Sequence, residues 1–172
     1  MTRPACFADL DFDAALAKAK SDGTLLLVAT KGGSPLSPVM DRMTWGDAGV
    51  VARLAKDVLA IQVDIEADPE LAKKLRIQYP PNVIAFKDGT QLDRVSNVQR
   101  PAEFIEWLDG LARGETNLDR ARAKVKAAPH DIVHRMHLAT RLGEAALYDE
   151  ETRECEHLWR HKIGRASCRE RV

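Results

Sequence analysis

The sequence lacks any pair of closely spaced cysteines. Its three cysteines, Cys6, Cys155 and Cys168, lie too far apart for a Cys-x-x-Cys or zinc-ribbon motif. So few cysteines in a chain of 172 residues are typical of a reducing compartment. We therefore predict a cytoplasmic, reduced protein.

Long hydrophobic runs and an excess of one charge are also missing. No apolar run approaches the roughly 20 residues of a membrane-spanning helix, and the N-terminus has no apolar segment typical of secretory signals. Lys+Arg and Asp+Glu both number 26. The chain therefore has no net positive charge that would attract nucleic acid or an acidic membrane surface. We expect neither as a partner. With 45% hydrophobic and 30% charged residues, the composition predicts a globular fold.

Histidine is absent from residues 1–129. The five histidines all come late in the chain: His130, His134, His137, His157 and His161. The first three and the last two are each spaced for one face of a helix, and together with Cys155 they form a candidate zinc site. No His-Glu-x-x-His pattern accompanies them, which favours ordinary surface histidines. We predict neither a metal nor a cofactor.

Apolar periodicity and turn residues predict an α/β arrangement over residues 1–115. Strands are expected over 24–30 and 58–65, and two more within 82–96 on either side of a Lys-Asp-Gly turn. Helices are expected over 11–23, 68–77 and 100–114. A further helix is expected to begin at Ser37 and to break at Gly46-Asp47. We predict two parallel crossovers and then an antiparallel hairpin. The result is a mixed sheet with helices on both faces.

No strand pattern remains after Gly114. A helix is expected over 117–128, stopped by Pro129, and a helix pair follows that meets near 147–149. Residues 116–161 are therefore predicted to form a helical extension.

The last eleven residues, KIGRASCRERV, follow neither a helical nor a strand pattern. They match the conceptual translation of a common sequencing adapter. We therefore expect residues 162–172 to be a sequencing artefact that truncates a longer natural protein. A genuine basic tail is the alternative.

Several local sequences resemble the thioredoxin superfamily in order and spacing over residues 11–113. The stretches SPVMDRMTWGDAGVVARL, VDIEADPELAKKLRI and IQYPPNVIAFKDG are similar to three segments of that family. The resemblance implies a thioredoxin-like mixed sheet. It also implies a cis-proline at Pro81, which fits the Pro80-Pro81 pair because only X-Pro bonds adopt cis readily.

The redox residues of that family are missing. Ser34-Pro35-Leu36-Ser37 stands in place of the Cys-x-x-Cys motif. Gly33 and Val28 replace the usual Trp and the proton-accepting Asp. Disulfide exchange needs an attacking thiolate and a second thiol, and a serine hydroxyl supplies neither. We predict a redox-inactive domain in which Ser37 caps a helix that begins with Pro38.

The resemblance implies a surface that binds extended peptides beside the cis-proline. We expect a protein or peptide partner there. The candidate groove residues are Gly33, Ser34, Ser37, Trp45, Tyr79, Pro80, Pro81 and Asn82. The alternative is a purely structural turn before the strand at 82–87.

Two enzymatic alternatives stay open. Some glutathione transferases hold the glutathione thiolate with a serine near this place, and Ser34 is the candidate here. No histidine precedes residue 130 to act as a base, so Ser34 and Ser37 are not predicted to be catalytic nucleophiles. A residual thiol-disulfide oxidoreductase that relies on Cys6 is a remote third interpretation.

The helical extension resembles one tetratricopeptide-type helix pair. The alternation of small and large side chains carries this resemblance, at Leu138, Ala139, Leu142, Ala145, Ala146, Tyr148, Cys155, Leu158 and Trp159. About three such repeats are normally needed for stability, so the resemblance implies the start of a longer helical array. A single helical hairpin that packs back on the first domain is the alternative.

Overall fold

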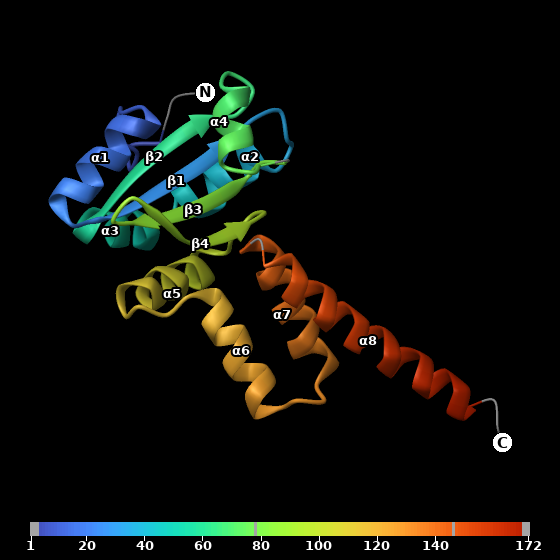
Figure 1. The fold of residues 1–172 in the computed structure, drawn as a ribbon. Coiled ribbons are helices and arrows are strands. Elements are labelled where there is room, and N and C mark those ends of the chain that lie inside the picture. The colour runs from blue at the N-terminus through green and yellow to red at the C-terminus, as the bar shows by residue number, and fades with distance from the viewer. Residues whose placement is uncertain (1–3, 78, 146, 170–172) are drawn as a thin grey trace. The chain divides into compact units, whose positions relative to one another are not determined.

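A computed structural model describes residues 4–77, 79–145 and 147–169. The chain divides into two compact units, residues 1–113 and 114–172, each of which is described by itself (Figure 1). Among the described residues, no helix is both long and apolar enough to cross a membrane.

The first unit is built on a four-stranded mixed sheet, which confirms the α/β prediction. Its strands are β1 (Leu25–Lys31), β2 (Val58–Asp64), β3 (Asn82–Lys87) and β4 (Thr90–Ser96), in the order β2-β1-β3-β4. Strands β1 and β2 are parallel, with Val28 opposite Ile61, and β3 pairs antiparallel with both β1 and β4.

The second crossover was predicted to be parallel, and that prediction is wrong. Strand β3 runs antiparallel to β1 because the connection after β2 stays at the end of the sheet where β2 finishes. That connection holds the short helix α4 (Pro69–Lys74), capped by the Asp68 carboxylate, which accepts from the N–H of Leu71 at 2.9 Å. The chain then turns at Pro80-Pro81, and β3 runs back along β1.

Helices cover both faces of this sheet (Figure 1). On one face, α1 (Phe12–Asp22) and α4 pack on the strands in a cluster that includes Phe12, Val28 and Ile61. The Asp11 side chain caps the start of α1 by accepting from the N–H of Ala14. The helix ends at Gly23, whose φ of 64° is the left-handed conformation that glycine adopts readily.

The other face of the sheet is covered by α3 (Ala48–Asp57) and α5 (Pro101–Ala112). Between β1 and α3 lie α2 (Ser37–Met40) and the π-helical turn η1 (Asp41–Trp45). The predicted break after this segment is confirmed, because Asp47 caps α3 by accepting from the N–H of Val50 at 3.0 Å. The core here is aromatic, with Phe104 packed between Trp45 and Trp107.

The second unit consists of α6 (Asn117–Ala127), α7 (Ile132–Glu144) and α8 (Tyr148–Arg169), which pack in sequence order around Ala121, Leu138 and Leu142. The backbone of α8 continues helically to Arg169, where the sequence had shown no helical pattern. Residues 170–172 lie outside the described residues. The adapter origin of 162–172 stays a prediction.

Candidate functional site

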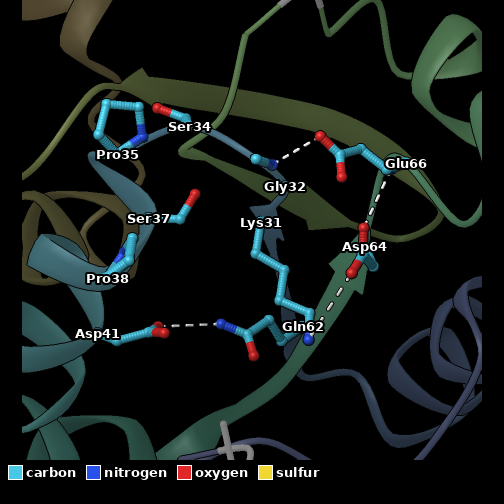
Figure 2. A pocket seen from close by; sticks show the side chains of 11 residues that line it. Lys31, Gly32, Ser34, Pro35, Ser37, Pro38, Asp41, Gln62, Asp64 and Glu66 are labelled. Carbon is cyan, nitrogen blue, oxygen red and sulfur yellow. Dashed lines mark hydrogen bonds and ion pairs between the residues drawn. The ribbon is translucent and has the colours of Figure 1, made fainter.

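A pocket of about 420 Å³ opens at the carboxyl ends of β1 and β2, where α2 begins (Figure 2). Parallel neighbouring strands finish at the same edge of a sheet, and α/β folds commonly bind ligands there. The pocket is lined by Lys31, Gly32, Gly33, Ser34, Pro35, Ser37, Pro38, Asp41, Gln62, Asp64 and Glu66.

The two serines of the pocket differ in their surroundings, and Ser37 does not have the role expected of it. The Ser34 hydroxyl accepts from the N–H of Leu36 at 3.2 Å, and the Ser34 carbonyl accepts from the N–H of Ser37 at 3.1 Å. Helix α2 begins after Leu36 without a side-chain cap, so the prediction that Ser37 caps it is wrong. Ser37 is instead the first helical residue, and its side chain is folded into the protein.

The Ser37 side chain is only 6% exposed, and its hydroxyl has no hydrogen-bond partner among the described residues. A buried polar atom without a partner costs free energy and calls for an explanation. Ser37 lines the pocket, and Figure 2 shows its hydroxyl directed into the cavity. A ligand in the pocket can supply the missing partner.

The loop after β1 is fastened to two neighbouring segments. The N–H of Gly33 donates to Oε1 of Glu66 at 2.7 Å. A Cβ on Gly32 would lie 3.1 Å from Cγ of Pro80, so the backbone of residue 32 lies beside the Pro80 ring in a space that a side chain would crowd. The loop that replaces the Cys-x-x-Cys motif therefore lies next to the Pro80-Pro81 turn.

Charged and polar groups line the floor of the pocket. Asp41 Oδ1 accepts from Gln62 Nε2 at 3.2 Å, and Asp64 Oδ1 accepts from the N–H of Glu66 at 3.1 Å. Lys31 Nζ lies 3.9 Å from Asp64 Oδ2, beyond hydrogen-bond distance. The pocket thus combines three carboxylates with one ammonium group.

The structure brings only part of the predicted groove together. Gly33, Ser34 and Ser37 line the pocket, and Pro80 contacts the same loop. The Pro80-Pro81 bond is cis, as predicted. The Tyr79 side chain is 82% exposed.

Three of the predicted groove residues that do not line the pocket, Trp45, Pro81 and Asn82, are buried. Trp45 is 4% exposed and packs edge-on against Phe7 and Phe104, so it belongs to the core. Asn82 is 6% exposed, and its amide bridges the Tyr79 carbonyl and the Ser96 hydroxyl. Trp45 does not line the pocket, and Asn82 shapes the turn from within.

Sequence reasoning missed the acidic side of the pocket. Asp64 ends β2 and Glu66 follows it, while Lys31 ends β1. The signal was present, because these charged residues directly follow two apolar runs that were predicted to be parallel strands. No comparable sequence pattern marks Asp41 and Gln62, because their contact depends on how α2 packs.

The remaining candidate groups are the Cys6 thiol and the late histidines. Burial raises the pKa of the Cys6 thiol, which disfavours the thiolate needed for disulfide exchange. Among the described residues, no group of three or more His, Cys, Asp or Glu side chains is arranged to hold a metal ion.

The fold is shared with the solved structures of a thioredoxin and of an oxidoreductase. A thioredoxin from Thermus thermophilus matches with a TM-score of 0.54 and 21% identity, over 70% of this chain and 95% of that protein. The DsbH oxidoreductase matches with a TM-score of 0.53 and 16% identity, over 66% of this chain and 91% of its own. This chain has the thioredoxin fold.

Sequence comparison adds one relative. A thioredoxin-like protein of Synechocystis sp. is 29% identical over 59 residues, which are 34% of this chain and 56% of the relative. The chain thus spans about half the length of the curated relative that it matches. No protein-family model matches the chain.

The thioredoxin fold gives Ser34 and Ser37 their context. They flank the turn between β1 and α2 where the resemblance places the two redox cysteines, and no cysteine replaces them nearby in the sequence. Val28, which stands in place of the proton-accepting Asp, is fully buried in the sheet, and its aliphatic side chain cannot accept a proton. A thiol-disulfide activity therefore has no support in this thioredoxin fold.

Proposed function

We propose that the first unit is a redox-inactive thioredoxin-fold module that binds an extended segment of a cytoplasmic protein partner. The observation that carries the proposal is the contact between Gly32 and Pro80, which joins the degenerate motif loop and the cis-proline turn into one surface. The unpartnered Ser37 hydroxyl on the same surface supports a ligand that offers polar groups.

The proposed surface has the properties that peptide recognition needs. Tyr79 is largely exposed, and aromatic side chains in such positions contribute much of the binding energy at interfaces. Pro80 has no N–H, so this residue pairs with a peptide backbone only through its carbonyl. The segment that binds must therefore donate a hydrogen bond there.

The second unit supports the same kind of role. Its helices α7 and α8 pack on each other, yet Val133, Met136 and Trp159 are each more than half exposed. Exposed apolar side chains on a helical repeat are the surfaces that neighbouring repeats cover. We propose that α7 and α8 form one helix pair of tetratricopeptide type in an interaction region.

A displayed library of random peptides tests the proposal for the first unit. Peptides selected on the immobilised full chain are expected to lose affinity for the Tyr79→Ala variant by about tenfold, because an exposed aromatic anchor is removed. Tyr148→Ala is the matched control, since Tyr148 is also an exposed tyrosine, 59% accessible, but lies in the second unit. Fluorescence anisotropy measures both affinities.

Two outcomes would contradict the proposal. One is that no peptide is enriched above the level found on a blank surface. The other is that enriched peptides bind wild type and Tyr79→Ala equally well, which would place their site elsewhere.

A further inference from the structure

We infer that the pocket at the ends of β1 and β2 receives a basic side chain, lysine or arginine, of the bound segment. This inference rests on the proposed function, because it assigns the chemistry of one position in the bound peptide. It follows from the charge of the pocket, the orientation of its carboxylates and the buried hydroxyl of Ser37.

The pocket carries a local excess of negative charge. Asp41, Asp64 and Glu66 stand against a single ammonium group, that of Lys31. The whole chain is formally neutral at pH 7, so this excess is a property of the site. A cationic ligand is attracted to such a cleft, and an anionic one is repelled.

The carboxylates are held in place by hydrogen bonds that each occupy one oxygen. Asp41 Oδ1 accepts from Gln62, Asp64 Oδ1 from the N–H of Glu66, and Glu66 Oε1 from the N–H of Gly33. The second oxygens of Asp41 and Glu66 keep their capacity to accept from a ligand, whereas Asp64 Oδ2 faces the Lys31 ammonium at 3.9 Å (Figure 2). Fixed acceptors of this kind suit the several N–H donors of a guanidinium or ammonium group.

Ser37 provides the second, independent observation. Its hydroxyl is buried, lacks a partner among the described residues and is directed into the same cavity (Figure 2). A ligand N–H that reaches this oxygen satisfies it. Because the surrounding acceptors are carboxylates, a ligand group that carries donors only is the best complement.

The ammonium group of Lys31 pairs only weakly with the carboxylates of the pocket. Its ammonium nitrogen stays 3.9 Å from Asp64 Oδ2, and both side chains are about 40% exposed. A pair of this kind contributes little and is readily replaced. An incoming basic side chain thus meets acceptors that Lys31 has not saturated, while Lys31 itself opposes the ligand through like charge.

Synthetic versions of the peptides selected on the full chain test the inference. Replacement of the basic residue by glutamine is expected to weaken binding by about tenfold, and the effect should shrink at high salt. The Asp41→Asn variant is expected to weaken binding of the basic peptide several-fold, because the new side-chain amide still accepts from Gln62 but carries no charge. Lys31→Gln should strengthen binding, since it removes the like charge.

Asp13→Asn is the matched control. Asp13 is an exposed carboxylate of the same unit, paired with Lys74 and outside the pocket. Its substitution changes the net charge by the same amount and is expected to leave affinity unchanged. Ser37→Ala is a second test, and it leaves the charge of the protein unchanged. It should reduce the affinity for the basic peptide more than the affinity for the peptide in which glutamine replaces the basic residue.

The possible failures are distinguishable. If no peptide is enriched, the proposed function and this inference both fall. If peptides bind without a preference for Lys or Arg, or if Asp13→Asn weakens binding as much as Asp41→Asn, only the pocket assignment is overturned. A preference that disappears in Asp41→Asn and survives in Asp13→Asn supports it.

Discussion

The N–H of Gly33 lies 2.7 Å from Oε1 of Glu66, so a hydrogen bond to a carboxylate ties the loop after β1 to the turn after β2. Removal of the carboxylate in Glu66→Ala is expected to free this loop and to cost about 1 kcal/mol, a typical net value for such a bond. Hydrogen exchange of the Gly33 amide measures the local effect, and urea unfolding measures the free energy.

Glu66→Gln is the control for this bond, because its side-chain carbonyl still accepts from Gly33 without the negative charge. Protection of the Gly33 amide should be largely retained in Glu66→Gln and lost in Glu66→Ala. Equal protection in wild type and Glu66→Ala would show that the loop is held by other contacts, such as the approach of Gly32 to Pro80.

The elements of the first unit were predictable because their signals are local. Asp47 and Asp68 each precede a helix and cap it with a side-chain oxygen, as their sequence context indicates. The apolar runs that became β1 and β2 are short and lie between turn residues. Each of these features depends on residues only a few positions apart.

The site was less predictable because it depends on long-range packing. Trp45 was expected in the groove that the thioredoxin resemblance implies. The structure turns it inward, because Phe7 and Phe104 supply aromatic partners from distant segments. Glu66, in the turn after β2, likewise contacts the motif loop across a long stretch of sequence, through its hydrogen bond with the N–H of Gly33.

Ser37→Ala is expected to stabilise the unliganded protein. The wild-type hydroxyl is buried without a partner, and its removal relieves a desolvation cost of about 1 kcal/mol, which corresponds to a rise in Tm of about 3–5 °C. Ser96→Ala is the matched control, since the Ser96 hydroxyl donates to Asn82 at 2.9 Å and its loss should destabilise. Thermal unfolding followed by circular dichroism compares the two, and a lower Tm for both would contradict the argument.

Two cysteines in place of the motif serines should restore some redox chemistry. The N–H of Ser37 donates to the carbonyl of Ser34, so the two residues lie within one turn, close enough for a disulfide. The double variant Ser34→Cys/Ser37→Cys, made in a Cys6→Ser background, is expected to catalyse insulin reduction by dithiothreitol. Wild type should be inactive.

The single variant Ser34→Cys in the same background controls for the second thiol and should remain far less active, because it cannot resolve a mixed disulfide. A folded double variant that forms its disulfide and still fails to catalyse exchange would show that the motif has been placed on the wrong residues.

Glutathione distinguishes the binding module from a transferase-like enzyme. At neutral pH glutathione carries two carboxylates and one ammonium group, and the pocket near Ser34 already has an excess of carboxylates. We therefore expect no change in Tm, whereas a specific ligand at ten times its Kd would add about 1.4 kcal/mol of stability. A saturable shift that vanishes in Ser34→Ala would support the enzyme instead.

The second unit offers a pH-dependent contact in the capping box of α6. Asp119 Oδ2 accepts from the Thr116 hydroxyl at 2.7 Å and from the Thr116 N–H at 3.1 Å, while the N–H of Asp119 donates back to that hydroxyl. These bonds, the side-chain one first, lower the pKa of Asp119 below its ordinary value of 3.8. The ionised carboxylate is therefore the form that holds the start of the helix.

The sign of the effect on stability follows from this lowered pKa. The contribution of Asp119 is fully present above the pKa of the unfolded chain and is lost as the pH falls through the lower, folded pKa. Carboxyl NMR is expected to give a titration midpoint for Asp119 below 3.8, and Thr116→Val should raise the midpoint while costing about 1 kcal/mol of helix stability. A midpoint that does not move in Thr116→Val would mean that the cap does not control this carboxylate.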